Sequence, residues 1–252
     1  MKLIFVTSNV TYVKDNFLHL LTAVSRKDRL PEGTNLAAVV FIEVPTHYLL
    51  KNIVGLQMIG APRFSLALLR NLISAKMNDG RLAIMKKEGI PVYRCKNINH
   101  PDAVQYMRKC SPDIIINMRT RNIYSKEVLD LPRIGCLNIH HGLLPENRGT
   151  MCDLWAWSEG RPVGYTIHWM NEKIDDGDIL LRQEVGVKHV RSYLDIPYAS
   201  SYSESENLLD CLHAIAGRGK FVSMKNVCDQ PRYTRSPTMN QILAMRRRGL
   251  QL

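Results

Sequence analysis

Short apolar runs of strand length alternate with segments of helical period along the first part of the chain. The runs occupy residues 2–7, 37–43, 91–94 and 113–118. Between them, apolar side chains recur with helical spacing over 13–25, 80–88 and 102–110. Two later runs, 134–140 and 163–170, are predicted to continue the same sheet. Because alternating strands and helices build a layered sheet, the pattern predicts an α/β fold with an open, mostly parallel, twisted Rossmann-like sheet and helices on both faces.

The segment 44–79 interrupts this alternation. It is long and apolar, and it contains no acidic residue between Glu43 and Asp79. Pro62 suits the first turn of a helix, so a helix over 62–77 is predicted, with a basic and an apolar side. We therefore expect a helical insertion after the second strand.

The chain after residue 190 also departs from the alternation. A helix is predicted over 204–216, with Ser203 as its N-cap and Gly217 closing it. The expected organisation is a first domain over 1–190 and a C-terminal helical or irregular extension over 191–252.

The overall composition is that of a soluble globular protein. The 252 residues are 45% hydrophobic and 23% charged, and no run approaches the roughly 18 apolar residues of a membrane span. The opening "MKLIFVTSNV" is predicted to be a strand rather than a signal peptide. Six scattered cysteines form no CxxC pair and no Cys/His cluster, which predicts no metal site and a reducing, cytoplasmic location.

The net charge is +11, from 34 Lys and Arg against 23 Asp and Glu. Such a surplus favours anionic partners, which include phosphorylated metabolites, nucleic acid and anionic membranes. Charge alone does not choose among them.

Polar side chains end two of the predicted strands. In extended backbone, Asn138 and His140 lie on the same face, with His141 turned away. The acidic turn that carries Asp175 follows the strand over 163–170. Since ligands bind beyond the carboxyl ends of strands in open α/β sheets, the amide, imidazole and carboxylate are expected to meet in one crevice.

Two stretches extend this set into a longer pattern, "DLPRIGCLNIHHGLLPENRGT" and "GYTIHWMNEKIDDGDIL". Together they contain an N-x-H strand end, an LLP loop with R-G behind it, a T-I-H strand and an I-D-x-G-D-I-L turn. This pattern resembles the catalytic domain of the folate-dependent formyltransferases, which include phosphoribosylglycinamide, methionyl-tRNA and amino-sugar N-formyltransferases. The resemblance is strong over 80–180 and general over 1–43.

The resemblance implies transfer of a formyl group from 10-formyltetrahydrofolate to a primary amine, with Asn138, His140 and Asp175 as the catalytic residues and no metal. The chemistry of these side chains agrees. The amine attacks the formyl carbon and negative charge develops on the oxygen, so hydrogen-bond donors must be in place, each contributing about 3 kcal/mol. Asn138 and protonated His140 are suitable donors, while Asp175 keeps the imidazole protonated and helps to remove the amine proton. His168 is expected to support the site rather than to catalyse.

Further residues follow from the resemblance. The pterin slot is expected at Arg121, Asn122, Ile123, Tyr124, Lys173, Ile174 and Asp176. Acceptor contacts are expected at Ser8, Asn9, His141, Gly142 and Arg148.

Two short stretches depart from the family pattern. Met118 and Arg119 replace a small, glycine-containing stretch and are expected to alter the slot. His141 and Gly142 replace a small residue or proline followed by serine. His141 is open to roles as a supporting group, an acceptor contact, or a core or solvated histidine, and Gly142 is expected to provide backbone angles and room that serine cannot.

The favoured acceptor is a small anionic amine, with a nucleotide-linked amino sugar as the first choice. Methionyl-tRNA relatives carry a further barrel domain, so tRNA is less favoured, and the loop "TSNVTYVKDN" lacks the glycines of the glycinamide ribonucleotide enzymes. Hydrolysis of 10-formyltetrahydrofolate and a non-catalytic binding role remain as alternatives. The helix over 62–77 is open to three roles: packing or a homodimer contact, a wall of the acceptor pocket, or contact with an anionic membrane.

Overall fold

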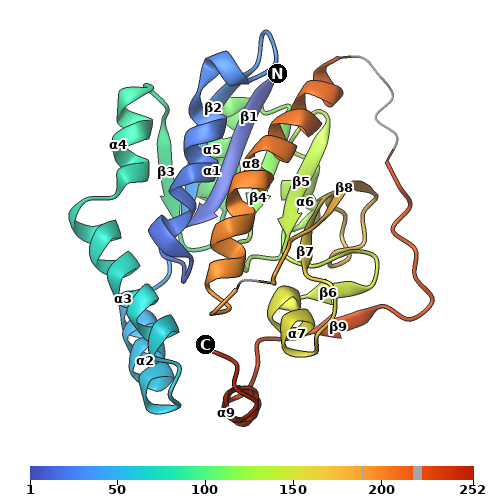
Figure 1. Cartoon of the computed structure of the whole chain (residues 1–252). Helices are drawn as coiled ribbons and strands as arrows, with labels where there is room; N and C mark the ends of the chain where they lie inside the picture. The colour runs from blue at the N-terminus through green and yellow to red at the C-terminus, as the bar shows by residue number, and fades with distance from the viewer. Residues whose placement is uncertain (189, 218–222) are drawn as a thin grey trace.

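The central sheet contains seven strands in the order β3-β2-β1-β4-β5-β7-β8 (Figure 1). The structure is a computed structural model that describes residues 1–188, 190–217 and 223–252. The strands are β1 (Lys2–Ser8), β2 (Asn35–Ile42), β3 (Val92–Cys95), β4 (Ile114–Met118), β5 (Gly135–His140), β7 (Gly164–Trp169) and β8 (Ile179–Glu184). The first five are parallel, which confirms the predicted α/β fold.

The strand predicted over 163–170 does join the sheet, but β7 runs antiparallel to both β5 and β8. Hydrophobic periodicity records which face of a strand is buried, not the direction in which the strand runs. The β8 strand that follows the Asp175 turn was not predicted.

Helices cover both faces of the sheet, as predicted. They are η1 (Lys14–Phe17), α1 (Leu18–Ser25), η2 (Lys27–Arg29), α2 (Thr46–Met58), α3 (Pro62–Met77), α4 (Gly80–Lys87), α5 (Pro101–Cys110), α6 (Lys126–Leu129), α7 (Cys152–Ser158), α8 (Asp195–Ala216) and α9 (Met239–Arg247). Short strands β6 (Asn147–Gly149) and β9 (Arg232–Thr234) pair in parallel beside the main sheet. None of the helices in the described ranges has the length and apolar character that a membrane crossing requires.

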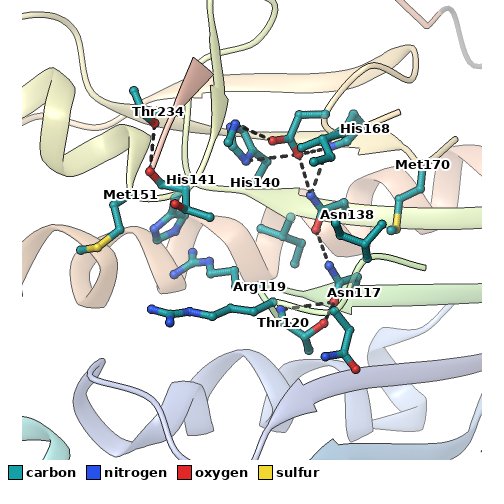
Figure 2. A pocket seen from close by; sticks show the side chains of 18 of the residues that line it. Asn117, Arg119, Thr120, Asn138, His140, His141, Met151, His168, Met170 and Thr234 are labelled. Carbon is teal, nitrogen blue, oxygen red and sulfur yellow. Dashed lines mark hydrogen bonds and ion pairs between the residues drawn. The ribbon is translucent and has the colours of Figure 1, made fainter. Parts of the chain in front are cut away.

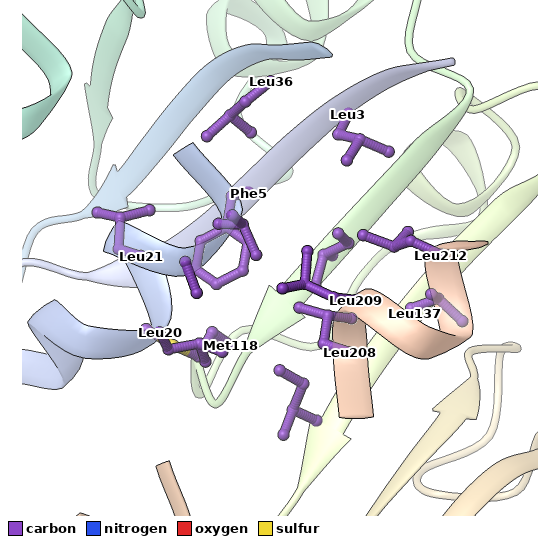
Figure 3. Close-up of a cluster of buried hydrophobic side chains, with 14 of the residues drawn as sticks. Leu3, Phe5, Leu20, Leu21, Leu36, Met118, Leu137, Leu208, Leu209 and Leu212 are labelled. Carbon is purple, nitrogen blue, oxygen red and sulfur yellow. The ribbon is translucent and has the colours of Figure 1, made fainter. Parts of the chain in front are cut away.

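Alternate side chains of β1 enter two separate cores. Leu3 and Phe5 pack with α1, α4 and α8, whereas Ile4 and Val6 pack with α5 and α6. Figure 3 shows leucines of α8 against the sheet residues of the first core. The chain after residue 190 therefore packs directly on the sheet.

The C-terminal helix α8 begins nine residues before the predicted start at 204 and ends before Gly217 as predicted. Ser203 is not an N-cap, because it lies within the helix and its hydroxyl donates to the carbonyl of Ser200 (3.0 Å). The first half of α8 buries small serines such as Ser201 and Ser205, whose hydroxyls bond to carbonyls three residues earlier. A buried face of serines lacks the apolar period that would mark a helix in the sequence.

The helix predicted over 13–25 is broken at its start. Residues Asp15, Asn16 and Phe17 have φ angles of 55°, 50° and 61°, and the regular helix begins only at Leu18. The guanidinium of Arg81, which is fully buried, donates to the carbonyls of Ser8, Asn9 and Asn16. A distant residue thus shapes this loop, so local sequence could not reveal the break.

The insertion 44–79 is helical, as predicted, and Pro62 occupies the first turn of α3. Leu49 and Ile53 of α2 pack against Leu68 and Leu72 of α3 and bury a small core of their own. Figure 1 shows α2, α7 and α9 near the edge of the sheet where the parallel strands end. The insertion therefore lies on the side of the molecule where the polar strand ends meet.

Candidate active site

A cavity of about 630 Å³ lies at the carboxyl ends of β4 and β5. Its walls include the loop after β4, the β7–β8 loop and the segment after β6, and Figure 2 shows its polar floor. Asn138, His140 and Asp175 all line it. The structure thus brings together the amide and imidazole of one strand and the carboxylate of a separate loop.

The Asp175 carboxylate is within contact distance of both other side chains. Oδ1 of Asp175 lies 3.4 Å from Nδ2 of Asn138 and 3.5 Å from Nδ1 of His140. The other oxygen, Oδ2, accepts a hydrogen bond from the backbone amide of Gly149 (2.8 Å). Asp175 is therefore the shared centre of the group.

The turn that presents Asp175 is tightly held. Asp175 has a φ of 50°, a left-handed conformation that is uncommon outside glycine and concentrates at functional sites. Asn226 donates to the carbonyls of Asp175 (2.9 Å) and Gly177 (3.0 Å). A Cβ at Gly177 would lie 1.9 Å from the carbonyl oxygen of Trp169, so only glycine fits there.

Electrostatics favours a charged His140–Asp175 pair. Burial raises the pKa of Asp175, but His140, a hydrogen bond from His168 and the Gly149 amide outweigh it and lower that pKa to about 2. Burial lowers the pKa of His140, but the charge of Asp175 and the contact with Cys152 outweigh it, so the pKa of His140 is raised. The surroundings therefore favour a carboxylate on Asp175 and a proton on the His140 imidazole.

Removal of this carboxylate should lower the pKa of His140. In Asp175→Asn the stabilising charge is gone and burial dominates, so the imidazole should lose its proton at a lower pH than in the wild type. Titration of the His140 ring by NMR measures this directly. Asp178→Asn, which removes a carboxylate paired with Lys225 from the same turn, is the matched control and should leave the titration almost unchanged. An unchanged His140 pKa in Asp175→Asn would exclude the proposed pairing.

The Asn138 carboxamide is oriented by its neighbours. Its Oδ1 accepts from Nδ2 of Asn117 (2.9 Å), and its Nδ2 lies 3.1 Å from Nε2 of His168 (Figure 2). Nδ1 of His168 donates to the carbonyl of Trp169 (2.7 Å), which fixes the orientation of the ring beside Asn138. This arrangement fits the supporting role expected of His168.

Gly142 provides space beside the His140 imidazole. Nε2 of His140 lies 2.9 Å from the carbonyl oxygen of Asn147. A Cβ at position 142 would lie 2.5 Å from this Nε2 and 2.9 Å from the same carbonyl oxygen. The φ angle of Gly142 is not in the left-handed region. The expectation that glycine supplies special backbone angles is therefore wrong, and close approach to the His140 ring is the reason for glycine.

The two departures from the family pattern meet at one buried carboxylate. Nε2 of His141 lies 2.7 Å from Oε1 of Glu204 on α8, and the guanidinium of Arg119 pairs with the same oxygen. Nδ1 of His141 lies 3.0 Å from Oδ2 of Asp153. Burial alone would raise the pKa values of both carboxyls. For Glu204, the charges of Arg119 and His141 outweigh burial and lower the pKa. For Asp153, the hydrogen bond and the charge of His141 are the main causes that lower the pKa. Arg119 is further held over the ring of Phe17, 4.3 Å from its centroid.

Most residues predicted for the pterin slot line the same cavity: Arg121, Asn122, Ile123, Tyr124, Lys173 and Ile174. Asp176 does not, because its carboxylate bonds to Arg148 (2.6 Å). Tyr124 contributes from a buried position, where its hydroxyl donates to Oδ1 of Asn117.

Among the residues predicted for the acceptor, His141 lines the cavity. Ser8 and Asn9 lie outside its lining, with their carbonyls bound by Arg81. Arg148 is also outside, since Asp176 and the carbonyl of Asn226 occupy its guanidinium.

Several residues of the site were not found from the sequence: Tyr12, Asn117, Asp153, Tyr193 and Glu204. Asn117 ends a predicted strand at the same edge as Asn138, so the strand-end argument could have identified it. Tyr193 donates to Asp153 (2.8 Å) and also contacts the hydroxyl of Tyr12 (3.4 Å). These contacts join distant segments, and no local pattern signals them.

Across the described ranges, no group of three or more His, Cys, Asp or Glu side chains is arranged to hold a metal ion.

The fold and the site define an α/β protein with an amide, an imidazole and a carboxylate at the sheet edge. The sequence model of the formyl transferase family matches residues 69–211, more than half of the chain, so the chain belongs to that family. The match extends into α8, beyond the 80–180 region of strong resemblance.

Relatives and solved structures agree with this membership. The chain is 35% identical over 127 residues to the bifunctional polymyxin resistance protein ArnA of Wigglesworthia glossinidia brevipalpis, covering 48% of this chain and 19% of that protein. It is 34% identical over 150 residues to methionyl-tRNA formyltransferase of Bacillus cytotoxicus, covering 51% of this chain and 48% of that protein. The chain thus matches about half or less of the length of these curated relatives.

Two solved structures share the fold. Glycinamide ribonucleotide transformylase 1 from Symbiobacterium toebii has a TM-score of 0.62 at 15% identity, covering 90% of this chain and 94% of its own. A sugar N-formyltransferase from a Shewanella species has a TM-score of 0.58 at 18% identity, covering 97% of this chain and 86% of its own. At these identities the likeness is one of fold alone.

Proposed function

We propose that the chain is an N-formyltransferase that moves a formyl group from 10-formyltetrahydrofolate to a primary amine. The observation that carries this proposal is the contact of Asn138 and His140 with one buried carboxylate, Asp175, on the floor of the large cavity. The cavity volume of about 630 Å³ is within the range of small-molecule sites, roughly 300–1,000 Å³. Apolar Ile123 and Ile174 on its wall suit a flat ring such as a pterin.

Each group has a defined task in this reaction. The amine attacks the formyl carbon, and the oxygen that gains negative charge accepts hydrogen bonds from Asn138 and from the His140 imidazolium. The contacts of these donors with Asp175, at 3.4 and 3.5 Å, are long, so a substrate oxygen can compete for them. Asp175 holds the charge on His140 and, directly or through water, assists removal of the amine proton. When the tetrahedral centre collapses, the bond between the formyl carbon and N10 of the folate breaks, N10 takes up a proton in exchange for the one that the amine has lost, and tetrahydrofolate leaves.

The acceptor that we propose to test first is a nucleotide-linked amino sugar. Three exposed cationic side chains line the cavity and suit the phosphates of an anionic acceptor: Arg121, Lys173 and Arg235. The Shewanella neighbour acts on a sugar, whereas other relatives act on methionyl-tRNA or glycinamide ribonucleotide. A tetrahydrofolate-release assay with these three acceptors, and with water alone to detect hydrolysis, discriminates among the alternatives. Tetrahydrofolate release with none of them, in a protein that binds folate, would favour a non-catalytic binding protein.

Folate binding should stabilise the protein independently of catalysis. At a hundred times its dissociation constant, 5-formyltetrahydrofolate should add about 2.7 kcal/mol, which corresponds to a rise in Tm of about 5–10 °C for a chain of this size. Differential scanning fluorimetry measures the shift.

A pair of matched variants locates the folate site. Ile123→Asp puts a charge in the predicted slot and should abolish the shift, whereas Ile134→Asp changes an exposed isoleucine outside the cavity lining and should retain it. Asn138→Ala should also retain the shift. Absence of any shift in the wild type at saturating folate would remove the co-substrate assignment.

A further inference from the structure

A second cavity of about 390 Å³ adjoins the candidate active site. It shares four lining residues with the first cavity: Tyr12, Arg121, Met151 and Ser236. The rest of its wall comes mainly from α2, the start of α3 and the C-terminal segment around α9. A molecule bound at the catalytic residues can therefore extend from the first cavity into the second.

The lining of the second cavity is apolar. Its large hydrophobic members include Leu56, Ile59, Phe64, Leu68, Leu154 and Ile242. Among the residues that the structure describes, the charged side chains that line it are Lys51 and Arg121, both cationic and exposed. Because the described lining carries two cations and no carboxylate, the amine end of a ligand belongs beside Asp175 and its apolar part belongs here.

Most of the wall comes from segments outside the region that matches the family model. All of its lining residues except Arg121, Met151 and Leu154 lie outside the region that matches the family model. Phe64 stacks on Tyr193, with ring centroids 5.5 Å apart. Arg246 of α9 donates to the carbonyl of Ile59 (3.4 Å), which ties the C-terminal helix to the insertion.

We propose that this cavity is a second acceptor subsite that binds an apolar group carried by the amine. The inference rests on the proposed function and narrows its substrate class to a primary amine with an aliphatic or similarly apolar part. Its anionic group remains on the cationic side chains of the first cavity. The insertion 44–79 then sets acceptor specificity through residues such as Phe64 that face the cavity, whereas Arg63 and Arg70 are exposed and line neither cavity.

Gly55 of α2 offers a direct test. It lines the second cavity, and a Cβ built there meets no other atom within 4 Å. Leucine and phenylalanine also have higher helix propensity than glycine, so Gly55→Leu and Gly55→Phe should fold while they fill the cavity. Gly55→Ala is the matched control for the loss of glycine.

The experiment compares n-butylamine and n-octylamine as acceptors with 10-formyltetrahydrofolate. Each fully buried methylene should raise kcat/KM by roughly fourfold, so the wild type should prefer n-octylamine by at least about tenfold. Gly55→Leu should reduce this preference and Gly55→Phe should remove it, with kcat/KM for n-butylamine and folate affinity unchanged. Equal kcat/KM for the two amines in the wild type, or a preference that survives in Gly55→Phe, would overturn the proposal.

Calorimetric titration with n-octylamine, without folate, separates this proposal from the proposed function. If no amine is formylated but the wild type binds n-octylamine and Gly55→Phe does not, the reaction assignment fails and the apolar site stands. If the wild type does not bind n-octylamine, the apolar site fails whatever the assay shows for other acceptors.

Discussion

Asn138→Ala, His140→Ala and Asp175→Asn are each expected to lower kcat for formyl transfer by two orders of magnitude or more. Removal of one preorganised donor at a developing oxyanion costs about 10²–10³ in rate, and loss of a positioned acid or base costs about 10²–10⁴. Asp175 contacts both other side chains, so the three groups act as one unit. Combining the substitutions should therefore add little to the largest single loss.

Single-turnover measurements of tetrahydrofolate release would test this, because they isolate the chemical step from product release. Asp178→Asn removes a carboxylate next to the same turn but outside the cavity lining and is the matched control, with an activity expected within a few-fold of the wild type. Retained stabilisation by folate would show that each catalytic variant is folded. Losses that multiply across the three substitutions would contradict a shared site.

The sequence was sufficient to predict the layers of the fold and the meeting of the catalytic side chains. Strand and helix periods define the alternation, and the rule that parallel strands end at one edge places Asn138, His140 and the Asp175 turn together. The same rule extends to Asn117, which ends β4 and orients Asn138. These are features for which local pattern and topology agree.

The sequence was not sufficient where a contact between a side chain and the backbone decides the local structure. The break before α1 depends on Arg81, and the early start of α8 depends on serines whose hydroxyls bond within the helix. The steric reason for Gly142 became clear only with the His140 ring beside it. Each of these features arises from a contact between side chain and backbone that hydrophobic periodicity does not record.

Glu204→Gln, which removes a buried charge behind the first cavity, is expected to destabilise the protein strongly. Glu204 is fully buried; it pairs with the guanidinium of Arg119 and contacts the His141 ring, which also contacts Asp153. Glutamine keeps the shape of glutamate but removes the negative charge, so the charge of Arg119 loses its partner.

Breaking a buried pair in this way costs about 3–5 kcal/mol of the free energy of unfolding. For a chain of this size the loss corresponds to a fall in Tm of about 6–20 °C. Glu206→Gln is the matched control, because Glu206 lies on the same helix and pairs with Arg29 at the exposed surface. Such surface pairs contribute about 0–1 kcal/mol. Urea denaturation of both variants at neutral pH measures the difference.

The pH dependence of the free energy of unfolding tests the contribution of Glu204 independently. Burial raises the pKa of Glu204, but Arg119 and His141 outweigh it, so the pKa is lower in the folded state than its ordinary value near 4.3. As pH falls, the unfolded chain therefore takes up a proton on Glu204 before the folded protein does. The stability that Glu204 contributes is present above about pH 4.3 and is lost as pH falls further towards the folded-state pKa. Glu204→Gln should accordingly lose less stability than the wild type between pH 5 and pH 3, whereas Glu206→Gln should follow the wild type closely. A variant as stable as the wild type at neutral pH, with the same acid limb, would show that Glu204 does not hold Arg119 and His141 in place.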